Sequence, residues 1–168
     1  WQKSSFTLRI ADDIIKYNLI PVVHDTKFAE RISEKAVKAD TVVKIHIKLN
    51  TGMTRLGFDA MKKEETVCAI KYIASLPNIE IDGIFSHFAD ADNEDMTYTR
   101  TQYKFYDEII EAIEKEGVII PNKHICNSAA LIANKEMALS GVRPGIILYG
   151  YYPEKYLKKI LPGIKPFM

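Results

Sequence analysis

The sequence predicts an α/β fold built on a parallel sheet, and two observations support this. Short apolar, β-branched runs recur along the chain, and stretches with helical spacing of apolar residues separate them. Strands that alternate with helices run parallel, because each helix carries the chain back across the sheet. An open doubly wound sheet and part of a (β/α)8 TIM barrel both satisfy this pattern. A complete barrel needs about 250 residues, so about five strands would form a partial one.

The first part of the chain contains two predicted helices and two predicted strands. Residues 8–18 have apolar side chains at helical spacing, and residues 20–24 (IPVVH) are typical of a buried strand. Asp25 is the expected N-cap of a helix that runs to about residue 38, because its carboxylate can accept from first-turn N–H groups. Residues 42–50 (VVKIHIKLN) form the second strand.

The middle of the chain continues the alternation. Residues 61–76 are predicted to be a helix, and residues 79–88 (IEIDGIFSHF) a strand. The longest helical pattern covers residues 97–116 and stops at Gly117, a residue that suits the left-handed end of a helix.

The last predicted strands are residues 123–127 and 141–150, with a short helix starting at Ser128 between them. The pattern is lost after Pro153. We therefore expect residues 1–153 to form one partial barrel domain, and residues 154–168 to be a linker toward a further domain.

Composition excludes several classes of protein. The net charge of +1 over 168 residues gives no basic surface for nucleic acid or an anionic membrane. No apolar run has the length needed to cross a bilayer. Cys68 and Cys126 cannot form a disulfide framework, which favours a reducing, cytoplasmic location. The first residue is Trp1, so we expect a piece of a longer protein.

Residues 44–50 alternate polar and apolar side chains, which a strand places on opposite faces. The apolar face consists of Ile45, Ile47 and Leu49, and the polar face of His46, Lys48 and Asn50. A polar face inside a barrel is costly unless its groups are paired, so this is either a solvated edge strand or part of a site. The loop TGMTRLG, which contains Arg55, follows directly and favours a site, because catalytic loops follow the strands of parallel folds.

His87 ends the strand at 79–88 and precedes an acidic stretch with Asp90 and Asp92. A lone histidine at a strand end is more often structural than catalytic, and the acidic stretch is typical of a solvated loop. These residues supply no third or fourth ligand of the usual kind, so we predict no metal site.

Two further signals indicate a phosphate site. Ser128 lies where a strand gives way to a helix, a place where free N–H groups bind anions, although serine there is also an ordinary N-cap. Arg143 in a buried strand needs an acceptor, and Gly145 allows a ligand to approach the backbone. Phosphate sites of barrels commonly lie after two consecutive late strands, as Ser128 and Gly145 do here.

Four blocks within residues 44–153 resemble, in order, those of the alanine racemase family: KLNTGMTRLGF, GIFSHFADAD, HICNSAAL and GVRPGIILYGYYP. The resemblance implies a partial TIM barrel of fold type III that uses pyridoxal 5'-phosphate (PLP). It also implies an isomerase that interconverts L-alanine and D-alanine through a PLP aldimine, for D-alanine biosynthesis and the cell wall. The expected full-length protein is a cytoplasmic homodimer.

The resemblance assigns roles to individual positions. Arg55 matches the arginine that contacts the PLP phenolic oxygen and the substrate carboxylate. Lys48 matches a lysine that is carbamylated in many members and holds that arginine in place. The phosphate-binding positions are Ser128, Gly145 and Ile146, the last two through backbone N–H groups.

Arg143 matches the arginine that faces the PLP pyridine nitrogen, and His87 matches a histidine in contact with that arginine. His124 and Asn127 match positions near the cofactor. Because arginine cannot accept a proton from the pyridine nitrogen, the resemblance implies an unprotonated ring, which suits removal and return of the α-proton.

The sequence departs from the family at four points. Asn50 stands where the family usually has Asp, and Thr54 where it usually has Gly; neither position has a chemical role. The VKAD stretch at 37–40 is not followed by AYGHG, so Lys38 is not the lysine that binds PLP. That lysine and the second base, a tyrosine of the partner subunit's C-terminal β-domain, have no counterpart here. The 168-residue chain is therefore expected to be inactive alone.

Two alternative functions remain open from the sequence. One is a non-catalytic PLP-binding barrel protein, although such proteins lack the TGMTRLG and RPGIILYG blocks seen here. The other is a racemase of the same family that acts on serine.

Overall fold

The computed structural model describes residues 10–167 of the chain. Residues 10–16 are helical, and the part of the predicted first helix that includes Leu8 lies outside the described residues. The named elements follow in this order: β1 (Val22–Val23), α2 (Thr26–Lys38), β2 (Val43–Asn50), β3 (Phe58–Asp59), α3 (Lys63–Ala74), β4 (Ile79–Phe85), α4 (Thr97–Lys115), β5 (Asn122–His124), α5 (Ser128–Ala133), two 3-10 helices (Lys135–Met137 and Ile146–Tyr149) and α6 (Leu157–Ile160).

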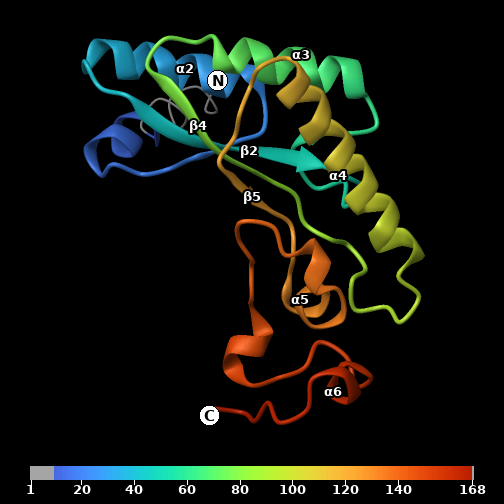
Figure 1. The fold of residues 1–168 in the computed structure, drawn as a ribbon. Coiled ribbons are helices and arrows are strands. Elements are labelled where there is room, and N and C mark those ends of the chain that lie inside the picture. The colour runs from blue at the N-terminus through green and yellow to red at the C-terminus, as the bar shows by residue number, and fades with distance from the viewer. Residues whose placement is uncertain (1–9, 168) are drawn as a thin grey trace.

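The sheet has five strands and every described pair is parallel. Its order is β1-β2-β4-β5, with β3 paired to β2 off this path (Figure 1). The strand β2 is therefore internal, which rules out the solvated edge strand. The predicted α/β fold with a parallel sheet is confirmed.

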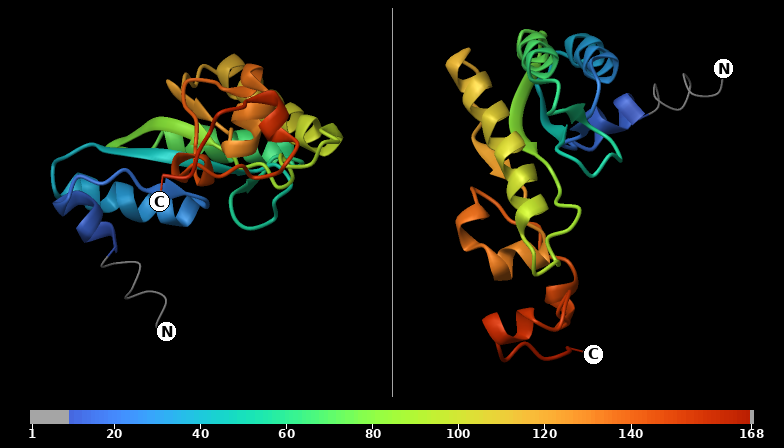
Figure 2. Two further views of the ribbon diagram at one scale, coloured as in Figure 1. Left: turned by 90° about the horizontal axis from the view of Figure 1, so that it is seen from below. Right: turned by 90° about the vertical axis from the view of Figure 1, so that its right-hand side faces the viewer.

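The helices α2, α3 and α4 lie side by side against the sheet, with α3 in contact with both neighbours (Figure 2). The apolar side chains of β2 pack into this layer: Ile45, Ile47 and Leu49 are fully buried in one core with residues of all three helices. The opposite face of β2 carries Lys44, His46 and Lys48. A helical layer on one face and polar groups on the other agree with a partial TIM barrel. After β5 the chain leaves the sheet, and α6 packs against α5 (Figure 1).

Local signals in the sequence set the ends of the helices. The Asp25 carboxylate accepts a hydrogen bond from the Phe28 N–H at 2.8 Å and caps α2 as predicted. Gly117 has φ of +80° directly after α4, so a residue without a Cβ stops that helix at low cost.

None of the helices in residues 10–167 is both long enough and apolar enough to cross a membrane.

The predicted strand at 141–150 is wrong. Only Gly141 forms a β-bridge, with His124, and the chain then turns into the 3-10 helix at Ile146–Tyr149. Arg143 still donates its N–H to the Cys126 carbonyl at 2.8 Å, but Pro144 has no N–H to continue a ladder. The fifth strand is instead the short β3, which the sequence pattern did not predict.

A β-bulge in β4 rearranges the polar face of the sheet. The register between β2 and β4 shifts by one residue, so that Ile45 pairs with Ile81 while His46 pairs with Gly83. The extra residue is Asp82, whose carboxylate lies 3.2 Å from the His46 ring. Gly83 provides the room for that ring, because a Cβ there would lie 2.5 Å from it.

We predict that Gly83→Ala destabilises the protein by about 1–3 kcal/mol, because the new methyl group overlaps the His46 ring. Urea unfolding would measure the free energy. Gly141→Ala is the matched control, since a Cβ there would meet His124 at an ordinary 3.5 Å. In a His46→Ala background, Gly83→Ala should cost much less. An unchanged cost in that background would contradict the explanation.

Candidate functional site

Lys48 is a buried lysine at the end of β2, on the face opposite the helices. Only 5% of its surface is exposed, and its Nζ donates to the Leu49 carbonyl at 2.5 Å. Burial, together with the positive charges of Arg143 and Arg55, lowers the pKa of Lys48 to about 8. The amine is therefore partly uncharged near neutral pH, which makes it a usable nucleophile.

Phe85 lies at the centre of the site, although no pattern in the sequence singled it out. Its ring stacks on His124 with centroids 4.9 Å apart and planes at 6°. The Arg143 guanidinium lies 4.5 Å from its centroid and the Lys48 Nζ 5.4 Å. The negative face of an aromatic ring attracts both cations, so Phe85 holds them close without neutralising them.

Behind Phe85, two histidines and a carboxylate form a hydrogen-bonded row across three strands. The Asp82 carboxylate lies 3.2 Å from Nε2 of His46, and Nδ1 of His46 lies 3.2 Å from Nε2 of His124. Burial, then the charges of Arg143 and His46, lower the pKa of His124 to about 4. His124 is therefore neutral at pH 7 and adds no charge beside Arg143.

Positive charge accumulates where Lys48, Arg55, His87 and Arg143 come together. Burial lowers the pKa of His87, and so do the charges of Arg143, Arg55 and Lys48. Burial and the Arg55 charge lower the pKa of Arg143 in the same direction. No carboxylate contributes to any of these shifts, so the cluster lacks a counter-charge within residues 10–167. Arg143 Nε and His87 Nδ1 are also buried without a hydrogen-bond partner in the described chain. This arrangement suits a bound anion.

Ser128 and Gly145 meet beside this cluster, as their positions in the sequence predicted. The Gly145 N–H donates to the Ser128 hydroxyl at 2.8 Å, and Ile146 begins the next 3-10 helix. Asn127, not Ser128, is the N-cap of α5, because its side chain accepts from the Ala130 N–H at 3.0 Å. The Ser128 hydroxyl is thus free of the capping role and available to a ligand.

Arg55 is exposed on the loop after β2, and Asn50 shapes this loop. The Asn50 side-chain oxygen accepts from the N–H groups of Gly52 at 3.2 Å and Thr54 at 2.9 Å. Thr54 has φ of +54°, a left-handed conformation that suits the glycine usual at this position in the family. Asn50 therefore has a structural role that the sequence analysis missed. An Asx residue before a Gly-containing turn was the available signal.

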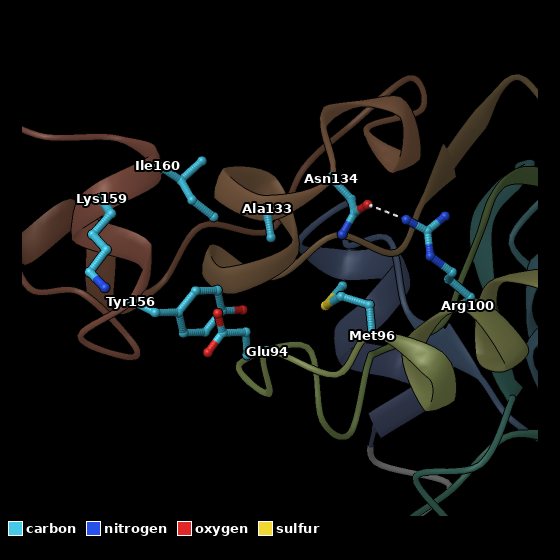
Figure 3. A pocket seen from close by; sticks show the side chains of 8 residues that line it. All are labelled: Glu94, Met96, Arg100, Ala133, Asn134, Tyr156, Lys159 and Ile160. Carbon is cyan, nitrogen blue, oxygen red and sulfur yellow. Dashed lines mark hydrogen bonds between the residues drawn. The ribbon is translucent and has the colours of Figure 1, made fainter.

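A separate pocket lies near the start of α4 and is lined by Arg100, Asn134 and Tyr156 among others (Figure 3). In it, Arg100 donates to the Asn134 side chain at 3.4 Å. None of the residues that the sequence assigned to the cofactor lines this pocket. The predicted site is therefore the basic cluster around Phe85.

Comparison with known proteins identifies the family. The family described as "Alanine racemase, N-terminal domain" matches residues 3–153. The chain is 47% identical to the alanine racemase of Clostridium tetani over 154 residues, which cover 92% of this chain and 39% of that protein. It is 43% identical to the alanine racemase of Methanococcus maripaludis over 155 residues, 92% of this chain and 41% of that protein.

Solved structures give the same result. The alanine racemase of Clostridium difficile 630 in complex with cycloserine superposes with a TM-score of 0.84 at 37% identity, over 88% of this chain and 40% of that one. The alanine racemase of E. faecalis gives a TM-score of 0.80 at 26% identity, over 95% of this chain and 42% of that one. The chain spans about two fifths of the length of these relatives. It belongs to the alanine racemase N-terminal domain family.

Proposed function

We propose that this chain forms the cofactor-binding part of a PLP-dependent alanine racemase. The observation that carries the proposal is the basic cluster of Lys48, Arg55, His87 and Arg143, which has no carboxylate partner in the described chain. PLP brings a phosphate and a phenolic oxygen, and an amino acid brings a carboxylate. These anions supply the charge that the cluster lacks.

The residues present fit PLP at both ends of the molecule. Ser128 and the N–H groups of Gly145 and Ile146 would hold the phosphate, with the Gly145 N–H exchanging its hydrogen bond to the Ser128 hydroxyl for one to the phosphate. The closeness of Ser128 and Gly145 supports this assignment. The buried, unpartnered Nε of Arg143 would donate to the pyridine nitrogen. The groups that hold the phosphate and the pyridine ring would in turn be supported by His87, Asn127 and His124.

When bound, PLP delocalises negative charge from the α-carbon of the amino acid. In the proposal, Arg55 orients the substrate carboxylate and the PLP phenolic oxygen. Lys48, as a carbamate, would hold Arg55 in place with the opposite charge. Arg143 would keep the pyridine nitrogen unprotonated, because a guanidinium only donates hydrogen bonds and cannot accept one from a protonated ring nitrogen. This would limit reactions other than proton removal and return.

The remaining elements of the proposal concern the whole protein. Residues 1–153 would form the barrel part, and residues 154–168 would lead toward a C-terminal β-domain. The lysine that binds PLP and the tyrosine base would come from sequence outside these 168 residues and from the partner subunit of a homodimer. The names of the relatives favour alanine as substrate. The proposal adds that the enzyme works in the cytoplasm and supplies D-alanine for the cell wall.

A polypeptide of these 168 residues alone, supplied with PLP, should not racemise L-alanine, because neither base has a counterpart in it. Conversion of L-alanine to D-alanine, followed with an enantioselective assay, tests this. Turnover above the PLP-only background would mean that another residue of this chain acts as the base.

In the full-length protein, Arg55→Ala should lower kcat by about a hundredfold or more, because the substrate carboxylate loses its charged partner. Asn50→Ala should cost about tenfold or less, since it loosens only the loop. Asn50→Asp keeps the oxygen that accepts from Gly52 and Thr54, and should be close to the parent enzyme. Steady-state kinetics measures all three. Equal losses for Arg55→Ala and Asn50→Ala would mean that Arg55 is misassigned.

Lys48 should form a carbamate at a lower pH than an ordinary lysine. Carbon dioxide reacts with the uncharged amine, and about half of the Lys48 amine is uncharged at pH 8, whereas an ordinary lysine needs a pH near 10.5. With 13C-labelled bicarbonate, the carbamate NMR signal should rise with pH through about 8 and level off about one to two pH units higher, where almost all of the amine is uncharged.

Lys48→Arg should remove this signal, while Lys71→Arg should leave it unchanged. Lys71 is the matched control because its hydrogen bond to Glu116 raises its pKa and keeps the amine charged. A signal that persists in Lys48→Arg would contradict the assignment.

A further inference from the structure

Gln102 is a fully buried amide on α4 that the proposed cofactor site does not include. Its exposed fraction is 0%, and those of its neighbours Ser86 and Thr51 are 1% and 2%. Gln102 Oε1 accepts from the Ala89 N–H at 2.9 Å, and Nε2 donates to the Thr51 hydroxyl at 3.4 Å. The Thr51 and Ser86 hydroxyls lie 2.8 Å apart, and Ser86 donates to the Leu49 carbonyl at 2.9 Å.

These groups form a row of hydrogen bonds that begins at the Ala89 N–H and ends at the Leu49 carbonyl. The two backbone groups at its ends fix the direction of every hydrogen bond in the row. Ala89 offers only an N–H, so the oxygen of the Gln102 amide must face it and the NH2 group must face Thr51. Leu49 offers only a carbonyl, so Ser86 gives its single proton there and Thr51 must donate to Ser86. The row therefore runs from the Ala89 N–H through Gln102, Thr51 and Ser86 to the Leu49 carbonyl, and each polar side-chain atom in it has a partner.

The row touches three of the segments that carry the basic cluster, namely those of Lys48, Arg55 and His87. The Leu49 carbonyl also accepts from the Lys48 Nζ at 2.5 Å, so Ser86 and Lys48 share one acceptor. Thr51 starts the Arg55 loop, and Ala89 follows His87 by two residues. One helical turn before Gln102, the Tyr98 hydroxyl donates to the Gly52 carbonyl at 3.0 Å and clamps the same loop on α4.

We propose that Gln102 is a positioning residue for the active site. It holds the Arg55 loop and the His87 segment at a fixed separation, and through Thr51 and Ser86 it fixes the carbonyl that orients the Lys48 amine. A positioning error of about 1 Å at a reacting group can lower the rate about a hundredfold. A residue that lies outside the site but sets the position of its groups can therefore affect the reaction rate. This inference rests on the proposed racemase function for its kinetic consequences, but not for its structural ones.

The test uses the full-length holoenzyme and four variants. Gln102→Met keeps the length of the side chain and removes both hydrogen bonds. Thr51→Val removes the hydroxyl at nearly constant shape, and Thr51→Ser retains it. The matched control is Thr99→Val: Thr99 lies on the same helix, is fully buried, and its hydroxyl has no hydrogen-bond partner among the described residues.

We expect Gln102→Met and Thr51→Val each to lower kcat about tenfold or more, with a smaller change in KM, while Thr51→Ser and Thr99→Val stay within about twofold. A fifth variant that combines Gln102→Met with Thr51→Val should lose no more than the worse of these two single variants, because either change breaks the same row. Multiplicative losses in the double variant, or a loss in Thr99→Val as large as in Gln102→Met, would overturn the proposal.

Hydrogen exchange followed by mass spectrometry separates this inference from the proposed function. Gln102→Met should increase exchange in residues 50–57 and 86–90, and Thr99→Val should not. If the parent protein racemises no amino acid but these segments loosen, the proposed function fails and the positioning role stands. If the parent is an active racemase and these segments exchange as before in Gln102→Met, the positioning role fails alone.

Discussion

Lys48 and Arg143 direct like charges toward one aromatic ring, that of Phe85. This ring lies on the face of the sheet that the helices leave uncovered. The positive charge of Arg55 lowers the pKa of both Lys48 and Arg143. Burial makes this repulsion stronger, because the protein interior screens charge less than water does. Two features oppose the repulsion: the hydrogen bond from Lys48 to the Leu49 carbonyl and the negative face of the Phe85 ring, while the neutral His124 adds no further charge. These groups hold the cations in place but do not neutralise them, so the site remains positively charged and favours the binding of an anion.

Other features of the structure position the polar side chains on this face of the sheet. On the far side of β2, Ile45, Ile47 and Leu49 are fully buried against the helices, and they fix the strand so that its polar side chains point the other way. The bulge in β4 brings Asp82 to the His46 ring, and Gly83 leaves space for it. The Asp82 carboxylate lies behind the histidines, away from the cations around Phe85. The one acidic group of this row therefore orients His46 without cancelling the charge at the front.

Local patterns in the sequence were sufficient for much of the fold. The N-cap Asp25, the stop at Gly117 and the alternation along β2 depend on neighbouring residues, and each was predicted correctly. The strand expected at 141–150 was not, because the apolar run Ile146–Tyr149 has the composition of a strand while Pro144 and the lack of a continuous partner prevent one. The short β3 depends on pairing with β2 and leaves almost no local pattern.

By itself, the sequence determined the order of the helices and strands from residue 22 to residue 133 apart from the short β3. It also determined the two faces of β2, and the family through four blocks of residues. The sequence also pointed to Ser128 and Gly145 as partners, and the structure joins them by a hydrogen bond although the strand expected before Gly145 does not form. Only the tertiary structure decided that Phe85 lies between Lys48 and Arg143, that His46 meets His124 across 78 positions, and that Gln102 joins two loops. Periodicity reports which face a side chain occupies, whereas these contacts depend on a register shift and on helix placement, which long-range packing sets.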